Sequence, residues 1–71
     1  MAKTKKEIIQ INIDGAEEKL IGLDLVLGHM EGIKATLEEG GDAYKNYQVQ
    51  IDQQTKVKET TEDWLKYLKS L

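Results

Sequence analysis

Residues 9–37 read IQINIDGAEEKLIGLDLVLGHMEGIKATL, and apolar side chains recur along this stretch in alternating steps of four and three residues. The positions of this first seam are Ile9, Ile13, Ala16, Leu20, Leu23, Leu27, Met30, Lys34 and Leu37, of which only Lys34 is polar. Such a heptad spacing is typical of a helix that packs along its whole length against other helices.

A weaker pattern with the same spacing runs through the second half of the chain. Its positions, the second seam, are Tyr44, Tyr47, Ile51, Gln54, Lys58, Thr61, Leu65 and Leu68. Gly40-Gly41 lies between the two seams and supplies a stop signal, because glycine easily adopts the left-handed conformation that ends a helix. We therefore expect an all-α, two-helix antiparallel hairpin, a short coiled coil whose second helix covers residues 43–70.

A second fold stays open because two segments are rich in residues that favour strands. Residues 7–14 (EIIQINID) alternate isoleucine with polar side chains, and residues 47–51 alternate in the same way. Asp14 and Thr60 each precede an acidic residue by three positions, as in a capping box, which would start helices at about residues 15 and 61. This alternative is a small α/β fold of the order β-α-β-α, with strands at 7–13 and 46–51. The unbroken first seam favours the hairpin, with a short extended arm over residues 5–13 as a variant.

Composition limits the classes of protein to which the chain can belong. Its 71 residues include ten lysines, no arginine, thirteen acidic residues and no cysteine, with a formal net charge of -3. The lack of cysteine excludes disulfides and zinc–thiolate sites, and a mildly acidic chain without arginine is unlike a nucleic-acid-binding protein. No run approaches the roughly 20 apolar residues that span a bilayer. We expect a cytoplasmic protein without a nucleic-acid or membrane partner.

Two segments are expected from the charge pattern near the N-terminus. Residues 1–6 contain three lysines and no acid, and they predict a flexible basic tail without a visible secretory signal. Residues 7–71 then form one small helical-hairpin domain. Within it, residues 7–42 hold nine acids against two lysines, whereas residues 43–71 hold five lysines against four acids. An acidic half and a mildly basic half suit antiparallel packing.

No arrangement of residues indicates catalysis or metal binding. Ser70 is the only serine and His29 the only histidine, so neither a nucleophile–base pair nor a histidine ligand pair can be assembled from them. Residues 12–15 resemble the middle of a calcium loop, but Ile21 would occupy a position that requires an oxygen ligand. We expect no enzymatic activity, no cofactor and no metal.

The expected activity is contact with other proteins. A chain this short buries only about 60% of its unfolded surface, so without disulfides it depends on an idealised core, on self-association or on a partner. The interface residues that we predict are Leu20, Leu23, Leu27, Met30, Tyr44, Tyr47 and Trp64. Gly28 and Gly32 share one helix face and would let another backbone approach closely. The partners that we expect are a second copy, giving a homodimer built as a four-helix bundle, and an unidentified protein.

The outline of the chain is similar to the small helical-hairpin partners of type VII secretion. The features that carry the resemblance are an acidic first helix, the glycine turn at 40–41, and Asp42-Ala43-Tyr44 at the start of a second helix. The Trp-x-Gly of that family is absent at the turn and the chain is shorter, so the resemblance concerns shape and assigns no residue roles. A cysteine-free, lysine-rich chain is also similar in composition to phage-encoded accessory proteins.

Two functional hypotheses follow. The first is a non-enzymatic interaction protein, such as an assembly factor, chaperone or inhibitor, that occupies a partner's surface. The alternative is a small oligomeric module of α/β type that sequesters a ligand or nucleotide.

Overall fold

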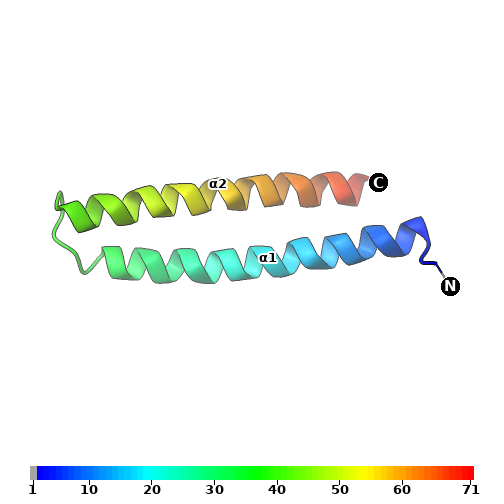
Figure 1. Ribbon diagram of the computed structural model, residues 1–71, viewed down its shortest axis with the longest axis horizontal. Coiled ribbons are helices and arrows are strands. Elements are labelled where there is room, and N and C mark those ends of the chain that lie inside the picture. Colours follow the sequence, from blue (N-terminus) through cyan, green and yellow to red (C-terminus); the bar gives the residue numbers. More distant parts are fainter. Residues whose placement is uncertain (1) are drawn as a thin grey trace.

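Two long helices joined by a short connection make up the molecule (Figure 1). The computed structural model describes residues 2–71. Helix α1 spans Lys5–Lys34 and helix α2 spans Asp42–Ser70, and the two lie side by side in antiparallel orientation. The hairpin measures 56 × 17 × 14 Å along its principal axes. The expected all-α hairpin is confirmed, whereas its association into a four-helix bundle stays a prediction.

The α/β alternative is wrong, because residues 2–71 contain no strand. The segments 7–13 and 46–51 are helical. The expected extended arm is also wrong, because every residue from 5 to 13 is helical. Asp14 and Thr60 lie inside helices and start none, and the Thr60 hydroxyl donates to the Lys56 carbonyl 2.9 Å away within its own helix. Strand propensity depends strongly on context, and here the continuous helical seam outweighs the local alternation.

Helix α1 begins inside the segment that the sequence analysis assigns to a basic tail. Thr4 is its N-cap, and the Thr4 hydroxyl accepts a hydrogen bond from the backbone N–H of Glu7 at 3.2 Å. Glu7 in the first turn and Lys34 in the last turn both suit the helix dipole. Lys5 and Lys6 are therefore the first residues of the helix.

The connection between the helices starts before the glycine pair. Helix α1 ends at Lys34, and the last turn tightens as the N–H and the hydroxyl of Thr36 both donate to the Ile33 carbonyl, at 3.0 and 2.7 Å. Gly40 has a φ of 82°, a left-handed conformation that favours glycine, and Gly41 is the N-cap of α2. The glycine pair thus reverses the chain and opens α2, and it does not end α1.

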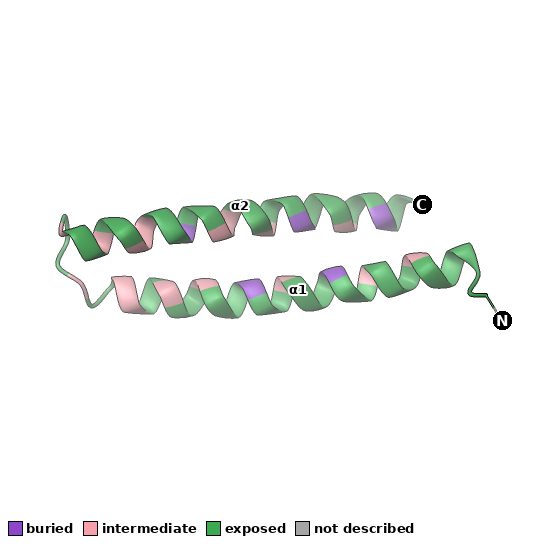
Figure 2. Cartoon of the chain, viewed as in Figure 1, coloured by how far each residue is buried: buried purple, intermediate pink, exposed green. Residues whose placement is uncertain are grey.

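The two predicted seams face each other and form the core (Figure 2). Every one of their seventeen positions is buried or half-buried. The most buried of these residues are Ala16, Leu23, Ile51, Thr61 and Leu68. Among the described residues no large side chain is completely enclosed, because a pair of helices can cover each seam from one direction only. The core is therefore a thin strip.

Polar residues in the middle of the second seam are accommodated without unpaired buried groups. The Thr61 hydroxyl donates to the Val57 carbonyl at 2.8 Å, and the Thr55 hydroxyl donates to the Ile51 carbonyl at the same distance. Across residues 2–71, no buried side-chain nitrogen or oxygen lacks a hydrogen-bond partner. The weak centre of the second seam is thus compatible with a continuous helix.

Replacing the core residue Ile51 tests the seam. Ile51 is 6% exposed, and Ile51→Ala should lower the free energy of unfolding by about 2 kcal/mol, since it removes buried methylene groups and leaves a cavity. The control is Val49→Ala, two residues away on the same helix and 55% exposed, which should change stability by less than about 0.5 kcal/mol. Urea unfolding followed by circular dichroism measures both, and equal effects would contradict the assigned seam.

Candidate interaction surface

The predicted interface residues separate into two groups in the structure. Six of them lie in the seam between α1 and α2 and are buried or half-buried there: Leu20, Leu23, Leu27, Met30, Tyr44 and Tyr47. Trp64 lies outside the seam and its side chain is 48% exposed. The hairpin therefore packs the first group between its own helices, and Trp64 is the most exposed residue of the predicted set.

The glycines Gly28 and Gly32 make no close approach within the hairpin. A Cβ atom added at either position would meet no atom within 4 Å, and both residues are exposed. The predicted close approach of another backbone to Gly28 and Gly32 would therefore involve a second chain, and it stays a prediction.

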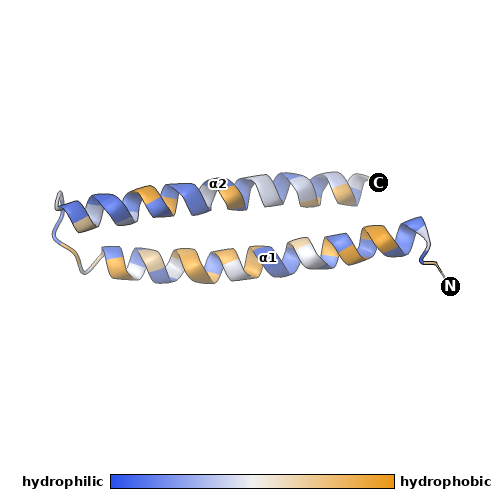
Figure 3. Ribbon diagram, in the orientation of Figure 1, coloured by the Kyte–Doolittle hydropathy of each residue, from blue (hydrophilic) through white to orange (hydrophobic). Residues whose placement is uncertain are grey.

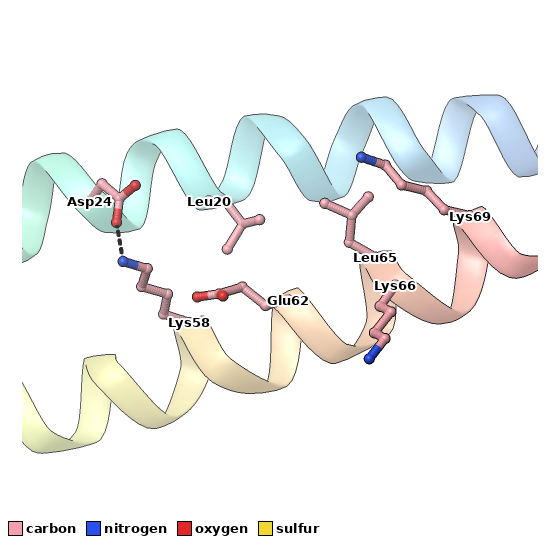
Figure 4. Close-up of a pocket in the computed structure, with 7 residues that line it drawn as sticks. All are labelled: Leu20, Asp24, Lys58, Glu62, Leu65, Lys66 and Lys69. Atoms are coloured by element: carbon pink, nitrogen blue, oxygen red, sulfur yellow. Dashed lines mark ion pairs between the residues drawn. The ribbon is translucent and has the colours of Figure 1, made fainter.

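One long side of the hairpin, which we call the charged edge, carries two ion pairs between the helices, and Figure 4 shows the one between Asp24 and Lys58. The Lys58 ammonium lies 2.7 Å from an Asp24 carboxylate oxygen, and the Lys69 ammonium lies 3.7 Å from that of Glu17. Asp24, Lys58 and Lys69 border an open groove of about 550 Å³. The charged edge comprises Gln10, Asp14, Glu17, Asp24 and Glu31 of α1 and Gln48, Asp52, Glu59, Glu62, Lys66 and Lys69 of α2, together with Lys58.

The Asp24–Lys58 pair affects the pKa of the lysine. The hydrogen bond that the Lys58 ammonium donates to Asp24 raises the pKa of Lys58 above its ordinary value of 10.5, and the charge of Asp24 adds to this effect. A raised folded-state pKa means that the pair stabilises the fold at neutral pH and that this stabilisation is lost as the pH rises through the folded-state pKa. Because both side chains are in contact with water, the contribution to stability is small.

Lys34 illustrates how a polar residue fits the first seam. Its ammonium donates to the side-chain carbonyl of Gln48 and lies 4.9 Å from the centre of the Tyr44 ring. A cation above an aromatic face is attracted by the ring's quadrupole. The only polar position of the first seam thus joins the two helices near the connection, on the side of the charged edge.

The opposite long side, which we call the neutral edge, is almost free of charge. Residues three or four positions apart lie on the same side of a helix. In α2 the relevant run is Gln50, Gln53, Val57, Thr60, Trp64, Tyr67 and Leu71, the last just beyond the helix, and none of these is charged. In α1 the run is Ile8, Asn12, Gly15, Lys19, Gly22, Val26, His29 and Ile33, in which Lys19 is the only residue with a formal charge.

The two runs of the neutral edge meet across the hairpin. Asn12, Gly15 and Lys19 of α1 line one groove of about 370 Å³ together with Thr60 and Trp64 of α2. Trp64 and Tyr67 stack on each other there, with ring centroids 5.6 Å apart. Large apolar side chains along the edge are left substantially exposed: Ile8, Val26, Val57, Trp64, Tyr67 and Leu71.

Apolar surface is concentrated on α1 (Figure 3). Outside the neutral edge, α1 also exposes Ile11, Ile21 and Leu25, of which Leu25 is 71% exposed and Ile21 lies toward the charged edge. The outer side of α2 is mostly polar and exposes Val49 as its large apolar residue. The hairpin therefore has one side suited to water and one side suited to contact with other apolar surfaces.

The sequence reasoning missed the neutral edge because it followed hydrophobic residues only. The run from Gln50 to Leu71 contains glutamine and threonine, so it does not stand out as apolar. Its signal is that all seven positions of this run, spaced three or four residues apart, are uncharged in a chain in which about a third of the residues are charged. Sorting the helical positions by charge would have revealed it.

Within residues 2–71, no three histidine, aspartate or glutamate side chains are grouped so that they could hold a metal ion. Neither of the described helices combines the length and the apolar character needed to cross a membrane. No protein-family model, curated protein or solved structure matches the chain. The surface is therefore interpreted from its own residues.

Removing the Asp24 carboxylate tests the charged edge. Asp24→Asn should lower the pKa of Lys58 toward 10.5, because it removes the negative charge and replaces the carboxylate that accepts the hydrogen bond of the ammonium. An alkaline titration of the Lys58 side chain by NMR measures the shift. The control is Asp14→Asn, which removes a carboxylate that bonds to Gln10 and should leave Lys58 unaffected. An unchanged Lys58 titration in Asp24→Asn would contradict the ion pair.

Proposed function

We propose that this chain is a non-enzymatic interaction protein that acts by occupying a surface of a partner, as assembly factors, chaperones and inhibitors do. The observation that carries the proposal is the neutral edge with its exposed aromatic pair, Trp64 and Tyr67. Tyrosine and tryptophan are enriched among the residues that dominate binding energy in interfaces, whereas charged residues are depleted from interface cores.

The thin core of the hairpin supports the same proposal. Each helix covers only one strip of the other, and five of the described residues are buried. A domain of this size gains little stability from its own core, so covering the neutral edge would add the missing apolar burial. Fully burying an exposed large apolar side chain contributes about 1.5–3 kcal/mol, and the side chains of the neutral edge, which are 37–60% exposed, would each contribute part of that before the costs of association.

The alternative of a ligand-sequestering module loses its main support, because it was derived from an α/β fold that the structure does not have. The grooves that border the two edges are open surface features between two helices. Small-molecule sites are usually concave and enclose most of their ligand. The interaction function is therefore the one that the geometry favours.

Site-specific photo-cross-linking in the cells that make the protein tests this function. A photoreactive amino acid at Val26, on the neutral edge and 47% exposed, should give discrete cross-linked products, because the edge is covered in the cell. The matched control is the same replacement at Val49, which is equally large, 55% exposed and on the outer side of α2. Mass spectrometry identifies the products, and equal labelling at the two positions would contradict a specific interaction through the neutral edge.

A further inference from the structure

We infer that the partner covering the neutral edge is a second copy of this chain, packed in antiparallel orientation so that the connections of the two hairpins lie at opposite ends of a four-helix bundle. This inference rests on the proposed interaction function and adds the identity and the orientation of the occupant. It is carried by the distribution of charge along the hairpin, by the residues that a two-fold axis would pair, and by the size of the face.

Charge differs between the two ends of the hairpin. The open end, formed by residues 2–10 and 64–71, holds five lysines and one acid. The end with the connection, formed by residues 31–45, holds four acids and two lysines. Two copies with their connections at opposite ends bring each basic end against an acidic end. Two copies with their connections together would place like charges against each other, which is unfavourable.

A two-fold axis that crosses α1 between Lys19 and Gly22 pairs the α1 run of the neutral edge with itself. Ile8 of one copy then lies level with Ile33 of the other, and Gly15 lies level with Val26. Asn12 lies level with His29, so that a polar side chain meets a polar side chain. The only formal charge of the run, Lys19, lies level with Gly22. Because glycine has no side chain, there is room for the lysine side chain to extend toward water.

The same axis pairs the α2 run in a compatible register. The ion pair between Asp24 and Lys58 and the groove shared by Gly15 and Trp64 bracket the level of α2 relative to α1, so the axis crosses α2 close to Thr60. Trp64 of one copy then lies level with Val57 of the other, and Leu71 lies level with Gln50. Both helices thus satisfy one symmetry operation, and the largest aromatic side chain meets an exposed valine.

The dimensions of the hairpin suit such a dimer. The axis passes near the middle of α1, so the copies overlap along nearly all of the 56 Å length. A face 56 Å long and 17 Å wide is comparable to the roughly 800 Å² per partner that stable interfaces bury. The neutral edges would form the centre of the bundle, and the charged edges would stay in water.

The mass in solution tests the identity of the occupant. Light scattering of the purified chain at two concentrations should give twice the mass of one chain. Val26→Glu should weaken the dimer at least about tenfold, since it replaces an apolar side chain of the interface by a charge that loses water on association. Val49→Glu adds the same charge on the outer side of α2 and should leave dimerisation unchanged within about twofold. A monomeric parent chain, or equal weakening by the two variants, would overturn the inference.

A distance measurement tests the orientation without disturbing the interface. The chain has no cysteine, so Ala35→Cys, at an exposed position close to the connection, accepts a single spin label. In the antiparallel dimer the two labels should lie about 40 Å apart, given the rise of 1.5 Å per helical residue. Labels about 10–20 Å apart, the spacing of neighbouring helices, would show the connections together and overturn the orientation.

The outcomes separate this inference from the proposed function. If the purified chain is a monomer while photo-cross-linking at Val26 joins it to a different protein, the second copy is excluded and the interaction function stands. If the chain is a dimer with widely separated labels, both the occupant and the orientation are supported.

Discussion

The single seam between α1 and α2 is the constraint on which the rest of the molecule depends. A helix in a hairpin can turn only one strip of its surface toward its neighbour, and here that strip is set by the alternation of three- and four-residue steps in both halves. Once Leu23 and Ile51 occupy the strip, the positions of all other side chains follow from helical geometry. The charged edge and the neutral edge are the two sides that remain.

The two edges differ in the side chains that they present to water. Ion pairs on the charged edge join the helices at Asp24–Lys58 and Glu17–Lys69, and their main effect is on register because exposed pairs contribute little energy. The neutral edge has no such pairs and leaves Trp64 and Tyr67 in contact with water. Under the proposed interaction, covering the apolar side would add to the stability of the fold, because a partner that binds only the folded chain stabilises it.

Much of the fold could be predicted from the sequence, because a seam that continues for four heptads is a long-range signal. Each residue of the predicted seams lies at the helix–helix contact, including the polar Lys34 and Thr61. The end of α1 was less predictable: the glycine pair suggested a stop at residue 40, whereas the helix ends at Lys34 and Gly40 serves the reversal of the chain. Local turn signals indicate where the chain bends, but hydrogen bonds of the last turn decide where the helix ends.

The surface was less visible in the sequence than the core. The leucines and tyrosines of the seam pack between the two helices of one hairpin, and this contact can be recognised only once the second helix is placed. Trp64 could be assigned to the surface only after the register of α2 was known. Pattern alone cannot distinguish packing within a chain from packing between chains, because both use the same spacing.

The short connection has a consequence for how the hairpin assembles. Contacts near the connection join residues close in sequence, such as Lys34 and Gln48, whereas contacts at the open end join residues as distant as Glu17 and Lys69. Closing a long loop costs more entropy than closing a short one. Contacts between the two helices should therefore form first next to the connection and then extend toward the termini. During synthesis α1 is complete before α2 exists, and its leucines stay without cover until the ribosome has released most of the second helix.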